Sequence, residues 1–99
     1  MSSAIDRLEY LEERHALKLL ACLYQNGRSQ RSSLYSAISK TTTAPMKRVN
    51  ELIAIGLVKE TILSGAPFTK NVELTENGKK IAKHVLEIQK ILVETEGPG

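Results

Sequence analysis

The chain of 99 residues has no tryptophan, one phenylalanine and one cysteine. With so few aromatic residues the core must consist mainly of Ile, Leu, Val and Ala, which favours helices packed on helices. The single cysteine, Cys22, excludes an internal disulfide. With only His15 and His84 to help it, Cys22 cannot complete a four-ligand zinc site either. We therefore expect neither a metal nor any other cofactor.

Long apolar runs are also missing. Uninterrupted apolar stretches last only a few residues, far short of the ~20 that span a bilayer. Residues 1–5 carry no signal-peptide pattern. We expect a soluble, cytoplasmic protein that does not engage a membrane. Hydrophobic residues still make up 41% of the chain, enough for one packed core, so we expect a single domain over residues 1–95 and a disordered tail at 96–99.

The motifs of common enzymes are absent as well. The sequence has no Gly-rich phosphate loop, no nucleophile elbow and no pair of histidines at ligand spacing. The neighbouring carboxylates Glu12 and Glu13 point apart on a helix and cannot share one substrate. We expect a protein that is not an enzyme.

Carboxylates are missing from the whole segment between Glu13 and Glu51. A net charge of only +3 conceals this basic central segment. Clustered Lys and Arg are typical of a protein that meets a phosphate backbone, although the same charges also occur on ordinary solvated surfaces. The lysines and arginines that lie between Glu13 and Glu51 are Arg14, Lys18, Arg28, Arg31, Lys40, Lys47 and Arg48.

The sequence predicts mainly helices in the first half of the chain. Residues 4–26 have helical apolar spacing, with Ala16, Leu17, Leu20, Leu23 and Tyr24 on one face and Asn26-Gly27 as the end signal. Leu11 projects opposite Leu20, so either the helix breaks near Glu12 and Glu13 or the chain has a second apolar face that needs a partner.

A short extended piece at 28–31 precedes a brief helix that Ser32 or Ser33 caps and that ends at Ile38. On this helix we expect Leu34, Ala37 and Ile38 to face inward. Tyr35 should lie at the edge of the core, as should Tyr10 and Tyr24, in preference to forming stacking platforms for single-stranded nucleic acid.

The second half begins with a helix over 43–55, capped by Thr43 and ended by Gly56. Its apolar positions fall on one side, and Thr43, Lys47 and Asn50 fall on the other. Alternating residues at 57–63 and 69–74, around turn residues at 64–67, predict a hairpin. Thr75 then caps a long final helix.

This order of elements resembles a winged helix-turn-helix domain of the MarR-like type, found in small bacterial and archaeal transcription regulators. Two stretches carry the resemblance, TAPMKRVNELIAIGLVKE at 43–60 and VELTENGKKI at 72–81. It implies an α+β, mostly helical fold with the order α-β-α-α-β-β-α and a long C-terminal helix.

The resemblance also implies sequence-specific binding of double-stranded DNA. The helix at 43–55 would enter the major groove, and the hairpin wing at 57–74 would lie on the flanking backbone. Lys47 suits a guanine edge and Asn50 an adenine edge, with Arg48 at their flank, whereas Glu51 on the same face argues against DNA. The other candidate DNA contacts are Arg28, Arg31, Lys40, Thr42, Thr43 and, on the wing, Lys70.

The final helix carries a wider apolar arc than one packing face requires. We therefore expect a homodimer, although the same residues could serve only to cover their own core. The expected interface residues are Ile5, Leu8, Leu11, Ile81, Val85, Ile88 and Leu92.

Two other functions fit the same sequence. One is a winged-helix module that holds a protein partner, and the other is an architectural nucleic-acid-binding protein with no specific site. The sequence marks no polar cluster for a small-molecule effector, which stays unknown.

Overall fold

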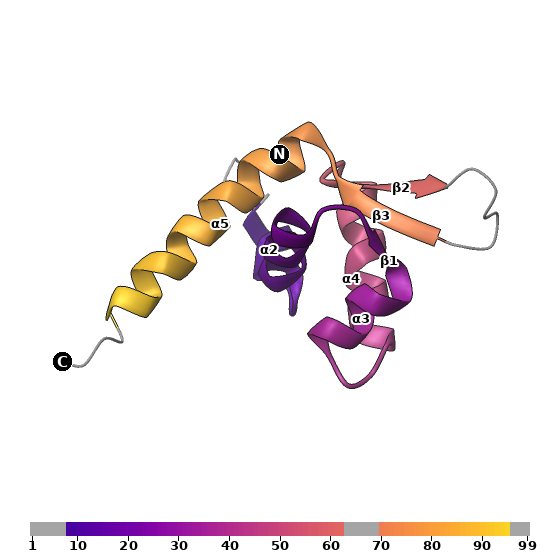
Figure 1. The fold of residues 1–99 in the computed structure, drawn as a ribbon, viewed down its shortest axis with the longest axis horizontal. Coiled ribbons are helices and arrows are strands. Elements are labelled where there is room, and N and C mark those ends of the chain that lie inside the picture. Colours follow the sequence, from indigo (N-terminus) through magenta and orange to yellow (C-terminus); the bar gives the residue numbers. More distant parts are fainter. Residues whose placement is uncertain (1–7, 63–69, 96–99) are drawn as a thin grey trace.

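A computed structural model describes residues 8–62 and 70–95 of the chain. The predicted α+β, mostly helical class with a long C-terminal helix is confirmed (Figure 1). Ile5, the turn at 64–67 and the tail at 96–99 lie outside the described residues. The elements are α1 (Glu9–Glu12), α2 (Ala16–Asn26), β1 (Ser29–Gln30), α3 (Arg31–Ile38), α4 (Thr43–Ala54), β2 (Val58–Ile62), β3 (Lys70–Leu74) and α5 (Glu76–Thr95).

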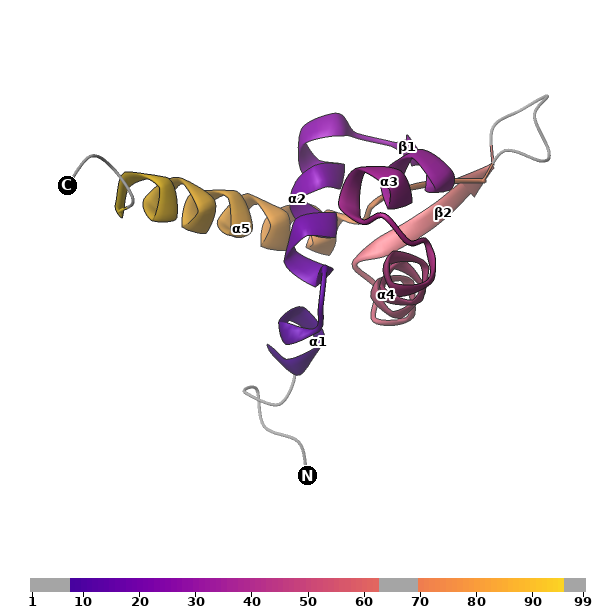
Figure 2. The ribbon, with the colours of Figure 1, turned by 90° about the horizontal axis from the view of Figure 1, so that it is seen from below.

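A break separates α1 from α2, as one of the two sequence interpretations predicts. His15 adopts a left-handed conformation with φ of 71°, which a residue with a side chain rarely does. The N–H of Ala16 donates to the carbonyl of Glu13 at 3.1 Å and closes the turn. The chain bends there, so α1 lies at an angle to α2 instead of extending it (Figure 2). Leu11 thereby reaches the core.

The buried face of α2 differs from the predicted one. Leu19 is fully buried beside Leu20 and Leu23, whereas Leu17 and Tyr24, predicted to be buried, are each 41% exposed. The positions Ala16, Leu19, Leu20 and Leu23 follow the i, i+3, i+4, i+7 spacing of a single face. Leu17 instead lines a groove between α2 and α5.

Two predicted caps are wrong, and the predicted packing face of α3 is correct only in part. Gln30 and Thr42 precede α3 and α4, and neither makes a side-chain cap bond. Ser32, Ser33 and Thr43 therefore lie inside their helices. Ser29 and Gln30 pair with β3. This pairing stops at Gln30, and α3 begins at the next residue, Arg31. Leu34 is buried and Ile38 packs against the core, as predicted, whereas Ala37 is exposed and Tyr35, predicted at the edge of the core, is buried.

The predicted hairpin forms the centre of a small antiparallel sheet with strand order β1-β3-β2. Residues 58–62 of β2 pair with residues 70–74 of β3, from Val58 opposite Leu74 to Ile62 opposite Lys70. The core lies between this sheet and helices α2, α3, α4 and α5. It consists largely of aliphatic residues, as the scarcity of aromatic residues predicts.

A compact junction joins the end of α4 to the start of α5. Gly56 ends α4 with a φ of 84°, a conformation that glycine adopts without steric cost. The Thr75 hydroxyl donates to the Gly56 carbonyl at 2.7 Å and accepts the N–H of Gly78 at 3.1 Å. The predicted cap at Thr75 is thus confirmed. A Cβ atom at Gly78 would overlap the carbonyl oxygen of Leu57, so this position requires glycine.

Only the first half of α5 packs on the rest of the chain. Ala82 is buried and Ile81 contacts the core, whereas Ile88 and the apolar residues after it at 91–93 are 51–60% exposed. In Figure 1, α5 leaves the body on one side and the hairpin β2-β3 extends on the other. Among the helices within 8–62 and 70–95, none is long and apolar enough to cross a membrane.

Candidate nucleic-acid interface

Helix α4 presents a polar face to solvent. Pro45, Val49 and Leu52 are buried, and they fix which side of the helix faces outward. Lys47 and Asn50 are exposed on the opposite side, where the sequence predicts them. Because one face of α4 is packed in the core of the protein and the opposite face is exposed, the exposed face can enter a groove of a ligand while the core stays folded.

A hollow of about 470 Å³ lies beside this face. It brings together side chains from α3, α4, the last residue of β1 and the first residue of β3. Lys70, predicted as a wing contact, therefore lies at the same hollow as Asn50. The residues that line it are Gln30, Arg31, Ser32, Tyr35, Met46, Asn50 and Lys70.

Arg31 bridges three elements at the hollow. Its Nε donates to the Tyr35 hydroxyl at 2.6 Å, and its Nη1 donates to Glu60 Oε2 at 2.7 Å. Its Nη2 donates to Asn50 Oδ1 at 2.6 Å. Burial by itself would lower the pKa of Arg31, but the hydrogen bonds to Tyr35 and Glu60 raise the pKa above its usual value. Arg31 is therefore a fixed cation that ties α3, α4 and β2 together.

Arg48 does not have the exposure that a DNA contact needs, which corrects its predicted role. Arg48 is only 8% exposed, and its Nε donates to the carbonyl of Arg14 at 2.9 Å. Its Nη1 binds Glu51 at 2.6 Å and lies 3.7 Å from Glu13. Arg48 thus connects α4 to the turn between α1 and α2.

Both carboxylates near the exposed face have cationic partners within the chain. Glu51, the acid that argues against DNA binding, pairs with Arg48. Glu60 pairs with Arg31. These ion pairs reduce the repulsion that free carboxylates would exert on phosphates.

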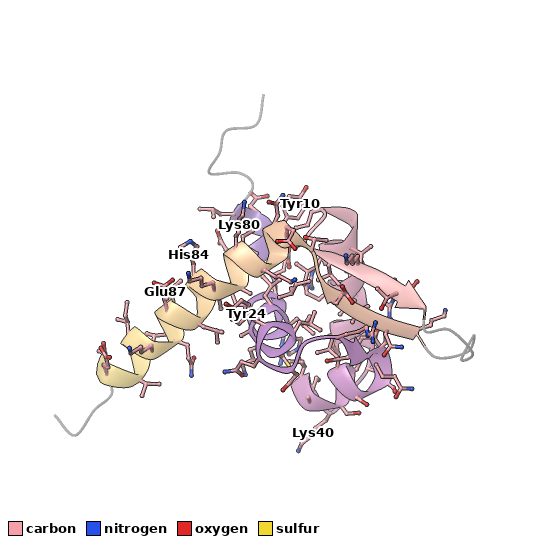
Figure 3. The ribbon with its side chains drawn as sticks, turned by 45° about the horizontal axis from the view of Figure 1, so that its top comes forward. Tyr10, Tyr24, Lys40, Lys80, His84 and Glu87 are labelled. Carbon is pink, nitrogen blue, oxygen red and sulfur yellow. The ribbon has the colours of Figure 1, made fainter. Side chains whose placement is uncertain are left out.

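The other predicted contacts divide between two places. Lys40 and Thr42 are exposed in the turn between α3 and α4. Figure 3 shows Lys40 projecting from that end of the body, while Lys80 and His84 project from α5 on the far side. Arg28 lies in a separate hollow beside Lys79 of α5. The structure therefore does not bring Arg28 to the face of α4.

Sequence reasoning missed several residues of the hollow. Gln30, Ser32 and Met46 line it, and Tyr35 and Glu60 hold Arg31. The spacing of Arg31 and Tyr35, four apart on a helix, is a signal that could have indicated their contact. Glu60 follows Arg31 by 29 residues, and no local pattern indicates that pair.

The residues predicted for a dimer interface fall into two groups. Leu11 and Ile81 pack against the core of their own chain, and Val85 is half-buried. Leu8, Ile88 and Leu92 are exposed. Two open grooves meet at Leu17, Lys18 and Ile88, one bounded by α1 and the other by α3.

These elements define a winged helix-turn-helix fold: α3 and α4 form the helix-turn-helix, and β2-β3 forms the wing. The fold predicted from the two stretches at 43–60 and 72–81 is therefore confirmed.

Solved structures match this fold closely, although no family model and no curated protein matches the sequence. The reduced form of the transcriptional regulator YodB from B. subtilis has a TM-score of 0.78 and 20% identity, covering 100% of this chain and 99% of that one. The multiple antibiotic resistance repressor MarR has a TM-score of 0.75 and 21% identity, covering 92% and 70%. A MepR mutant from S. aureus, bound to an oligodeoxyribonucleotide, has a TM-score of 0.71 and 20% identity, covering 91% and 67%.

Proposed function

We propose that the protein is a homodimeric transcriptional regulator that binds specific sites in double-stranded DNA. Helix α4 enters the major groove, and the wing lies on the flanking backbone. The observation that carries this proposal is the exposed face of α4 at Lys47 and Asn50, held outward by a buried opposite face. The MepR structure with a bound oligodeoxyribonucleotide supports a nucleic-acid ligand for this fold.

The charges around α4 also favour a polyanionic ligand. Glu51 and Glu60 are paired within the chain, whereas three lysines are exposed: Lys47 on α4, Lys40 in the turn before α4, and Lys70 at the hollow beside α4. Lysines near a groove contact provide phosphate contacts that fix the position of the helix. We propose Lys47 for base edges, and Lys40, Thr42, Thr43 and Lys70 for phosphates.

The dimer rests on the apolar surface of α5. Ile88, Leu92 and Leu8 leave a large exposed apolar area on one side of the molecule, and such patches mark interfaces. A second copy that covers this patch would place two α4 helices on one duplex. For a palindromic site the two helices lie about one DNA turn apart, ~34 Å.

A salt series on duplex DNA tests the function. If the dimer contacts six to ten phosphates, a plot of log affinity against log salt has a slope of roughly −5 to −9. Fluorescence anisotropy with a labelled duplex measures it. Binding that is weak and insensitive to salt would contradict the proposal and favour a protein-interaction module. Equal affinity for a selected site and for random DNA would favour an architectural protein.

Lys47→Ala tests the face of α4 directly. We expect weaker binding and a relaxed sequence preference, because a base-edge contact is lost. Lys83→Ala is the matched control, since Lys83 is an exposed lysine on α5. The same anisotropy measurement should show the control close to the unsubstituted protein. Equal, negligible effects of both substitutions would remove α4 as the DNA-binding face.

A further inference from the structure

The contact between Arg31 and Asn50 fixes which end of the Asn50 amide faces outward. Arg31 Nη2 lies 2.6 Å from Asn50 Oδ1. A guanidinium carries only donors, so the amide atom that faces it must be the oxygen. The NH₂ group of Asn50 is then the end turned away from Arg31, on a residue that is exposed on α4.

This orientation changes what Asn50 can read. Bidentate binding of adenine requires the amide to accept a hydrogen bond from N6 and to donate one to N7. Here Oδ1 is directed toward Arg31 and accepts a charge-assisted hydrogen bond from it, the stronger kind of hydrogen bond, so the end of the amide that is turned away from Arg31 does not carry the acceptor. The outward NH₂ is a donor only, and guanine presents two acceptors, O6 and N7, at its major-groove edge.

Arg31 is itself held in place. Its side chain is 16% exposed and binds Glu60 at 2.7 Å, and its Nε binds the Tyr35 hydroxyl at 2.6 Å. Movement of Arg31 to a phosphate would break these contacts and leave Glu60 without its partner at the DNA surface. The geometry therefore favours Arg31 as a positioning residue behind α4 over Arg31 as a phosphate contact.

We propose that Arg31 orients the amide of Asn50 so that Asn50 selects guanine, where the sequence alone predicts adenine. The proposal rests on the proposed function, because it assumes that α4 enters the major groove. Arg31 does not itself contact the base. It affects which base is selected only by orienting Asn50. A cation beside the amide further favours the acceptor-rich edge of guanine over the N6 amino group of adenine.

Selection of bound sequences from a random duplex pool at moderate salt tests the proposal. The unsubstituted protein should select guanine at one position of each half-site. Asn50→Ala should lose that preference, by roughly 5-fold in relative affinity, the lower end of the discrimination that base-edge hydrogen bonds provide. Arg31→Met frees the amide to turn, so adenine should replace guanine at the same position.

Two further variants act as controls. Lys83→Ala, at an exposed lysine on α5 that contacts neither Arg31 nor Asn50, should retain the guanine preference. Asn50→Asp keeps the acceptor toward Arg31 and removes the outward donors, so it should lose the preference even though Arg31 is unchanged. Asn50→Asp therefore tests the same geometry if Arg31→Met does not fold.

The outcomes separate this proposal from the function on which it rests. If Arg31→Met weakens all sequences alike and leaves guanine selected, Arg31 is a phosphate contact and the proposal is overturned. Selection of a site at which no guanine depends on Asn50 also overturns it, and leaves DNA binding intact. If the unsubstituted protein selects no duplex at all, both proposals fail.

Discussion

The guanidinium of Arg48 is buried, whereas Lys47, one residue earlier on α4, is exposed to solvent. Successive residues on a helix differ by about 100° in direction, so one of two adjacent cations faces the core side and the other faces out. Glu51 and the carbonyl of Arg14 receive the inward guanidinium. Arginine suits this position because its fork of donors reaches several acceptors at once.

Arg48→Met should lower the free energy of unfolding by about 1–3 kcal/mol, because it leaves the partly buried carbonyl of Arg14 without its donor. Methionine retains much of the aliphatic stem, so the loss reports mainly the polar contacts. Urea unfolding followed by circular dichroism measures the change. Lys47→Met, on the exposed neighbour, should stay within about 0.5 kcal/mol. Equal losses in both variants would show that Arg48 has no special structural role.

The sequence predicts the exposed residues of the site better than its internal contacts. A helical projection places Lys47 and Asn50 on the outer face, and the structure agrees. The same projection cannot identify the partners of Arg31 and Arg48. Glu60 is separated from Arg31 by 29 residues, and the Arg14 carbonyl is separated from Arg48 by 34. Such contacts depend on the tertiary fold, so local periodicity does not encode them.

At the scale of elements, the junction between α4 and α5 is the most constrained part of the fold. Thr75 binds the last turn of α4 through Gly56 and the first turn of α5 through Gly78. The N–H of Thr75 also donates to the Leu57 carbonyl at 3.0 Å. Leu57 and Gly78 approach so closely that no side chain fits between them.

Gly78→Ala should therefore destabilise the protein by about 3 kcal/mol, the upper end of the usual cost of overpacking, because the added methyl group overlaps the backbone carbonyl of Leu57. Thermal unfolding measures the loss. Asn77→Ala, at the exposed neighbouring position, should leave stability unchanged or slightly higher, since alanine favours helix. A tolerated Gly78→Ala would mean that α5 can shift away from Leu57 without cost.

The order and type of elements were predictable, whereas some boundaries were not. Strong periodicity identified α2, α4 and α5, and turn residues identified the hairpin. The caps of α3 and α4 were wrong because the sequence offers Ser32 and Thr43, while the sheet places the first cap at Gln30, two residues earlier, and the turn before α4 places the second at Thr42, one residue earlier. The break at His15 was predicted only as an alternative, since its left-handed backbone has no glycine to signal it.

At the scale of the whole molecule, α5 and the hairpin extend in opposite directions from a small core (Figure 1). The principal extents of 51 × 42 × 26 Å reflect this elongated shape. A long helix whose second half contacts little of its own chain leaves its apolar residues to a partner. The proposed dimer would cover that half of α5 and leave α4 free.

Ile88→Glu combined with Leu92→Glu should convert the dimer to a monomer, because two charges would be buried in an apolar interface. Sedimentation equilibrium should show the mass halved while circular dichroism still shows a folded chain. Lys90→Glu also alters charge on the exposed part of α5, but at a polar position, and should leave the mass unchanged. A monomeric unsubstituted protein would contradict the dimer, and DNA affinity would then come from one α4 helix alone.

The close packing of Gly78 on Leu57 has a mechanical consequence for such a dimer. With no side chain between them, a tilt at the base of α5 would displace Leu57, which lies between the end of α4 and the first strand of the wing. In the proposed dimer, the separation of the two α4 helices would then change whenever the angle between the two α5 helices changes.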